Sequence, residues 1–176
     1  MKDPPAESIS NVIHEGIKRG IEILLEKKCY GSAVILLYAG MDAMAYLDMP
    51  NGQQDVKRKD FIAWADKYIR FPCDEQLTGL DLYGARCSML HSYGVASELS
   101  RKGKCRMLGY MDKSVPELRY NPKVSKNLVM VSITGLAEAF FKGVDRFIID
   151  VFGDPTRAPF ARKRLRKLVH AWPYKP

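Results

Sequence analysis

The chain has few of the residues that build metal and redox centres. It holds only 3 histidines and 4 cysteines among 176 residues. Cys29, Cys73, Cys87 and Cys105 form no CxxC pair. This arrangement argues against a zinc site and favours reduced, partly buried thiols. We therefore expect no metal and no cofactor.

The chain also lacks an uninterrupted apolar run of the roughly 18 residues that cross a bilayer. The longest candidate, residues 33–47, is broken by Asp42, and no apolar signal-peptide core follows residues 1–5. There is no internal repeat, no low-complexity tract and no glycine-rich phosphate loop. We expect a cytoplasmic protein with no membrane partner.

Positive charge is concentrated at the C-terminus. The net charge is +8, and residues 154–176 supply seven Lys/Arg and one Asp, which is +6 of it. A polyanion such as nucleic acid would be attracted to this segment. The alternative is a solvated helix face that only keeps the protein soluble.

Apolar residues recur at helical spacing through most of the chain. The pattern predicts helices over residues 6–28, 30–47, 61–69, 74–92 and 123–152, and a basic helix over 160–169. Residues 95–122 form a long irregular insert, in which 106–111 and 117–120 are candidates for a short pair of strands. The predicted fold class is all-α, an antiparallel bundle of four to five helices. We expect residues 1–152 to form this domain and 153–176 a basic extension.

One stretch of the predicted 74–92 helix combines side chains that act on phosphates. Arg86 is a permanent cation with a fork-shaped head, and His91 exchanges a proton near neutral pH. Asp42 is the only charge of the 30–47 helix, and we expect it either to fix packing by an ion pair or to orient Arg86 or His91.

The spacing Arg-x4-His-x-Tyr at Arg86, His91 and Tyr93 resembles the motif of the HEPN superfamily, in particular that of HEPN toxins from toxin–antitoxin pairs. The resemblance implies a helical core over roughly residues 6–152, a metal-independent endoribonuclease and a site composed by two copies in a homodimer. In such toxins a nucleotidyltransferase antitoxin modifies the tyrosine, here Tyr93. Active members usually carry a polar residue after the arginine, where this chain has Cys87.

The hypothesis assigns His91 to proton transfer and Arg86 to the scissile phosphate. Non-specific RNA contacts are expected from six basic residues: Arg101, Lys102, Lys104, Arg162, Lys163 and Arg164. On a straight helix Arg86 and His91 would point about 140° apart. Convergence on one phosphate would therefore need a distorted or ending helix, a swung arginine or a second copy.

The competing interpretation is a non-catalytic, dimeric helical module that binds nucleotide, RNA or a protein. In that case His91 only caps a helix end, Arg86 is the structural partner of Asp42 or Asp81, and Tyr93 covers the helix terminus.

Overall fold

The computed structural model describes residues 9–112 and 117–168. Helical elements are η1 (Ser10–Lys18, a π-helix), α2 (Arg19–Glu26), α3 (Tyr30–Asp48), α4 (Arg58–Tyr68), α5 (Gly79–Ser92), α6 (Glu98–Arg101), α7 (Ile133–Gly153) and α8 (Ala158–Leu165). Three strands complete the fold: β1 (Met107–Met111), β2 (Leu118–Tyr120) and β3 (Leu128–Ser132). The structure is therefore mixed α/β.

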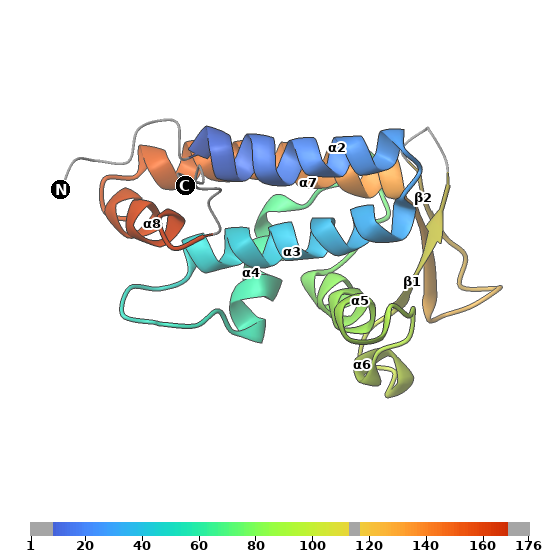
Figure 1. Cartoon of the computed structure of the whole chain (residues 1–176). Coiled ribbons are helices and arrows are strands. Elements are labelled where there is room, and N and C mark those ends of the chain that lie inside the picture. The colour runs from blue at the N-terminus through green and yellow to red at the C-terminus, as the bar shows by residue number, and fades with distance from the viewer. Residues whose placement is uncertain (1–8, 113–116, 169–176) are drawn as a thin grey trace.

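Helix α3 runs through the centre of the molecule. It contacts η1, α2, α4, α5, α7 and α8, with α2 and α7 on one side and α4 and α5 on the other (Figure 1). Nine of its residues are buried, which explains its nearly all-round apolar sequence. Gly40 is required at its crossing with α7, because a Cβ there would lie 2.7 Å from Cζ of Phe140.

Within the described residues, α3 is the one helix long and apolar enough to cross a membrane by length and composition. Half of the qualifying window is buried inside the structure. Its two charged residues are both paired, Asp42 with Arg86 and Asp48 with Arg157. These are the surroundings of the core helix of a soluble protein.

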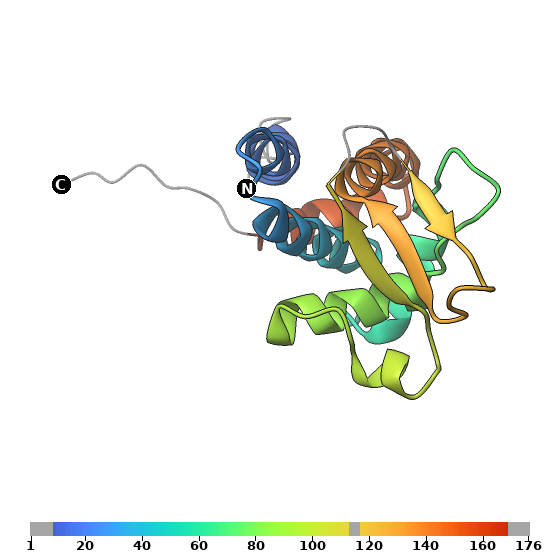
Figure 2. The same cartoon turned by 90° about the vertical axis from the view of Figure 1, so that its right-hand side faces the viewer.

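The expected all-α bundle is wrong, because a small mixed sheet closes one end of the helical layers (Figure 2). Its order is β1-β3-β2, with β3 parallel to β1 and antiparallel to β2. Strands exist in both places where the sequence suggested them, but they do not pair with each other. Each pairs with β3, which the sequence analysis assigned to the 123–152 helix.

The strand β3 alternates between buried and half-buried side chains, as a strand with two unequal faces does. Val129 and Val131 are fully buried. Ser132 then ends the strand and caps α7, accepting a hydrogen bond from the Gly135 amide at 3.1 Å. This cap explains why the helix begins at Ile133 and not near residue 123.

Helix α8 belongs to the core of the domain, in contrast to the separate extension expected from residue 153. Ala161 and Leu165 are buried in the central cluster. Arg157 bridges Asp48 at the end of α3 (2.6 Å) and Asp150 on α7 (3.1 Å). The last part of the expected extension, residues 169–176, lies outside the described residues.

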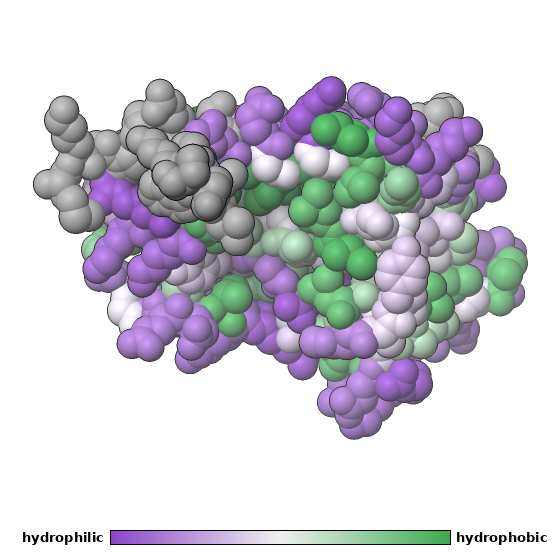
Figure 3. All heavy atoms as spheres, in the orientation of Figure 1, coloured by the Kyte–Doolittle hydropathy of each residue, from purple (hydrophilic) through white to green (hydrophobic). Residues whose placement is uncertain are grey.

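An apolar band crosses the face formed by η1, α2 and α3 (Figure 3). The shallow groove within it is lined mainly by Val12, Ile17, Leu36, Ala39 and Ala43.

Candidate functional site

The start of α5 is fixed by a reciprocal cap that also holds the strand β1. Thr78 accepts from the Asp81 amide at 3.1 Å, and Asp81 accepts from the Thr78 amide at the same distance. The buried Asp81 also accepts hydrogen bonds from the backbone (2.8 Å) and guanidinium (2.7 Å) of Arg106, directly before β1. These bonds tie the end of the loop that carries α6 to the start of α5.

The end of α5 is a left-handed turn made by Tyr93, with φ of 52°. The Tyr93 amide donates to Met89 O, the single bond of the αL capping motif, and the Gly94 amide donates to Ser88 O. The left-handed position thus belongs to Tyr93 and not to the glycine that follows it, Gly94. A tyrosine in this conformation costs about 1 kcal/mol relative to glycine. The tyrosine side chain therefore has a role at this position that glycine could not fill.

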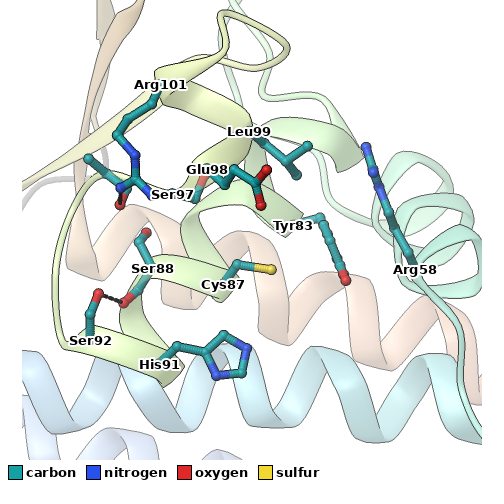
Figure 4. A pocket seen from close by; sticks show the side chains of 11 residues that line it. Arg58, Tyr83, Cys87, Ser88, His91, Ser92, Ser97, Glu98, Leu99 and Arg101 are labelled. Atoms are coloured by element: carbon teal, nitrogen blue, oxygen red, sulfur yellow. Dashed lines mark hydrogen bonds between the residues drawn. The ribbon is translucent and has the colours of Figure 1, made fainter.

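Between α4, α5 and α6 lies an open cleft of about 540 Å³ (Figure 4). His91 lies at one end of it with an exposed imidazole. Arg58 from α4 and Arg101 from α6 also line the cleft, and Tyr83 and Cys87 line it from α5. The remaining lining residues are Ser88, Ser92, Ala96, Ser97, Glu98 and Leu99.

Tyr83 lies between two guanidinium groups. The Cζ atom of Arg58 is 5.4 Å from the centre of its ring and that of Arg86 is 6.0 Å away, both within cation–π range. Burial and the neighbouring Cys87 thiol raise the pKa of Tyr83, and the two arginines only partly oppose this. Tyr83 therefore stays a neutral phenol at physiological pH.

Arg86 is directed to α3 and away from the cleft. Its Nε and Nη2 donate to Oδ2 of Asp42 at 2.9 and 2.8 Å, and both side chains are about one-fifth exposed. Burial raises the pKa of Asp42, and the hydrogen bonds and charge of Arg86 offset this only in part. This is the contact that the ion-pair interpretation of Asp42 expected.

Arg86 and His91 do not line one cavity within a single chain. The helix α5 stays regular to Ser92, so the divergence expected for five residues of straight helix persists. Tyr83, Cys87 and His91, spaced four residues apart, share the cleft face instead.

Tyr93 is 63% exposed, yet its hydroxyl end rests on the first turn of α3. A Cβ added to Gly31 would lie 1.6 Å from the hydroxyl oxygen, so the phenol occupies the space left by this glycine. Covalent modification of the oxygen would require the ring to turn away from Gly31.

The basic residues expected to contact RNA fall into three groups. Arg101 reaches the cleft and donates to Ala96 O at 3.0 Å, while Lys102 pairs with Glu98 and Lys104 is exposed nearby. Arg162 and Lys163 are exposed on α8, at the opposite end of the molecule (Figure 1). Arg164 is buried, and its donors are used inside the chain, which argues against an RNA contact.

The described residues contain no group of three His, Cys, Asp or Glu side chains that could hold a metal ion. The four cysteines are unpaired; Cys29 and Cys73 are exposed, Cys87 is half-buried and Cys105 is buried.

Sequence reasoning missed Arg58 and Tyr83. Tyr83 had a detectable signal, since its spacing to Cys87 and His91 puts all three on one helical face. Arg58 had none, because its place depends on how α4 packs against α5. No family model, curated protein or solved structure matches this chain, so the HEPN-type assignment depends on the Arg86, His91 and Tyr93 motif alone.

Proposed function

We propose that this chain is a metal-independent endoribonuclease of the HEPN type, acting in the cytoplasm as a toxin or a stress or defence RNase. The observation that carries the proposal is the exposed His91 imidazole in a cleft that also presents Arg58 and Arg101. An imidazole beside two permanent cations suits an RNA phosphodiester, since the arginines attract the phosphate and the imidazole exchanges the proton.

In the reaction, His91 accepts the proton of the RNA 2′-hydroxyl as its oxygen attacks the adjacent phosphorus. The bond from phosphorus to the 5′-oxygen breaks, and that oxygen takes a proton from a general acid. The products are a 2′,3′-cyclic phosphate and a 5′-hydroxyl. Arg58 and Arg101 stabilise the charge that builds on the phosphoryl oxygens.

A second copy of the chain supplies the general acid in this scheme, as its own His91 in the imidazolium form. The exposed apolar side chains of Tyr93 (63%) and Val95 (54%) follow His91 directly and offer contact area for that copy. Asp42 holds Arg86 outside the lining of the cleft, with the guanidinium carbon 6.0 Å from the centre of the Tyr83 ring. Arg86 acts in this arrangement by positioning Tyr83.

The test is incubation of the purified protein with RNA in EDTA, with cleavage products mapped and their ends analysed. The His91→Ala variant should lose about 10²- to 10⁴-fold in rate, the range for loss of a general acid–base group. His14→Ala is the matched control, since His14 lies on η1 and does not line the cleft.

Two further results decide the mechanism. An RNA with 2′-O-methyl groups should survive, because its attacking oxygen carries no proton. Added imidazole should partly restore cleavage by His91→Gly, which a merely structural histidine would not allow. Equal cleavage by wild-type protein and His91→Ala would overturn the assignment.

The second candidate is a non-catalytic module that binds nucleotide, RNA or a protein partner in the same cleft. The observation that favours it is the commitment of Arg86 to Asp42, together with Cys87 in place of the usual polar neighbour. Under this alternative RNA binds intact, and Arg58→Ala with Arg101→Ala abolishes binding while His91→Ala leaves it nearly unchanged.

If the chain is a toxin, a nucleotidyltransferase antitoxin would modify the Tyr93 hydroxyl. The protein would be incubated with ATP and with the nucleotidyltransferase encoded nearest to its gene. Mass spectrometry would then detect a nucleotide on Tyr93. Modification that persists in Tyr93→Phe would exclude this residue as the acceptor.

A further inference from the structure

A second concave region lies far from the cleft, where α8 faces the turn that follows α3. It consists of two adjoining cavities of about 360 and 380 Å³. Phe160, Met49, Asn51 and Arg164 line both, so the two cavities form one groove on either side of the Phe160 ring. In Figure 1, α8, which lines the groove, lies at the opposite end of the molecule from α6, which lines the His91 cleft.

The groove is held in shape by the buried Arg164. Its Nη1 donates to Leu47 O at 3.1 Å and to Met49 O, and its Nη2 donates to Pro50 O at 2.7 Å. One guanidinium thus holds three backbone carbonyls, at the end of α3 and the start of the turn, against α8. A groove built in advance loses less conformational entropy when a ligand binds.

Helix α8 and the turn directly after it, which holds Lys167, present an aromatic ring and two ammonium groups to this groove. Phe160, Lys163 and Lys167 follow one another at helical spacing, and Phe160 is 38% exposed. Within the described residues neither lysine has a carboxylate partner. Tyr46 lines the same cavity from α3 and adds a second ring.

We propose that this groove binds single-stranded nucleic acid, with a base on the Phe160 ring and flanking phosphates on Lys163 and Lys167. Exposed aromatic rings beside cations are the usual means of binding single strands, because every base has a face that can stack. The proposal goes beyond the cleavage chemistry and does not require it, since binding here uses none of the cleft residues.

The polar lining favours a nucleic acid over an acidic peptide or a membrane surface. The side-chain amides of Asn51 and Gln54 line the cavity and can both donate to and accept from base edges. The carboxylates of an acidic peptide would use only the donors of this lining. A lipid surface would not enter a concave groove between a helix and a turn.

The experiment measures fluorescence anisotropy of a labelled thymidine oligodeoxynucleotide of about 12 nucleotides, in parallel with an abasic strand of the same length. A DNA probe cannot be cleaved through a 2′-hydroxyl, so failure of the proposed ribonuclease activity would not affect the result. Phe160→Leu keeps apolar volume but removes the ring, and should weaken binding of the thymidine strand about 10-fold while leaving the abasic strand unaffected.

The Lys163→Ala/Lys167→Ala double variant should weaken both strands and reduce the slope of log K against log salt by about 1.4. Lys123→Ala/Lys126→Ala, on the exposed β2–β3 connection, is the charge-matched control, and Ile149→Ala on the surface of α7 is the apolar one. Circular dichroism of each variant confirms that it is folded.

Three outcomes would overturn the proposal. The first is equal affinity of the wild-type protein for the thymidine and abasic strands. The second is an unchanged affinity in Phe160→Leu. The third is competition by polyglutamate or by phosphatidylserine vesicles as strong as that of the oligonucleotide, which would mean that the lysines attract any polyanion.

Discussion

The groove beside α8 and the His91 cleft use arginine side chains in opposite ways. At the C-terminal end of α3, Arg164 is buried and donates to three backbone carbonyls. In the His91 cleft, Arg101 donates to a single exposed carbonyl, that of Ala96, and keeps its head in the open. One arginine stabilises the fold and the other stays accessible to a ligand, although both belong to segments that look equally basic in sequence.

The strongest test of this difference replaces each arginine in turn by an uncharged side chain. Arg164→Met should lower the free energy of unfolding by about 3 kcal/mol, because three carbonyls lose a charged donor in a buried place. Arg101→Met should change it by less than about 0.5 kcal/mol, as expected for an exposed contact. Urea denaturation followed by circular dichroism gives both values.

Arg164→Lys keeps the charge but has no planar guanidinium. Its free energy of unfolding should therefore lie between those of Arg164→Met and Arg101→Met. Equal stability of Arg164→Met and Arg101→Met would contradict the structural role given to Arg164.

A second comparison concerns two carboxylates, Asp81 and Asp42, each of which pairs with an arginine. Asp81 accepts hydrogen bonds from Arg106 and from the Thr78 amide, and these outweigh its burial and lower its pKa. Asp81→Asn should therefore cost about 2 kcal/mol at pH 7. Since its ionised form is favoured in the folded state, the stability that Asp81 contributes is present above about pH 4 and is lost as the pH falls further.

The measurement is thermal or urea unfolding of wild type and Asp81→Asn between pH 2 and 7. The gap in unfolding free energy between the two proteins should become smaller as the pH falls. A constant gap would show that Asp81 is not preferentially ionised in the folded state.

Asp42 should respond to pH in the opposite direction. Burial dominates over Arg86 and raises its pKa, so its contribution is fully present below about pH 4 and is lost as the pH rises through the raised value. At pH 7 we expect Asp42→Asn to change stability by no more than about 1 kcal/mol, since Arg86 is partly exposed to water.

The unfolding free energy of wild type relative to Asp42→Asn, measured between pH 4 and 7, should fall as the pH rises. A rise over that interval would mean that the ion pair with Arg86 outweighs burial.

How far the sequence predicted this structure depends on the range of the contacts involved. The helix over 30–47 was predicted almost to the residue, because its apolar pattern and the turn after Met49 are local signals. The divergence of Arg86 and His91 also followed from helix geometry alone. Residues 128–132 were assigned wrongly, since Leu, Val and Met suit a buried helix as well as a strand, and only pairing with the distant β1 decides between them.

The candidate site shows the same limit. Local spacing identified His91 and could have identified Tyr83, whereas Arg58 enters the cleft through the packing of two helices. The basic residues 162–164 illustrate this limit most directly. Lys163 and Arg164 are adjacent in the sequence, and only the docking of α8 on α3 leaves the first exposed and buries the second.

The smallest expected effect comes from Gly31→Ala, which tests the contact between Tyr93 and α3. The new Cβ would collide with the Tyr93 hydroxyl, but the end of an exposed ring can move away cheaply. Alanine also favours a helix over glycine, so we expect stability to change by only a few tenths of a kcal/mol. Tyr93 should become more accessible, seen as faster iodination of this residue in Gly31→Ala than in wild type. In the Tyr93→Phe background the same substitution should add no iodination, and an unchanged rate in the single variant would mean that Gly31 does not restrain the hydroxyl.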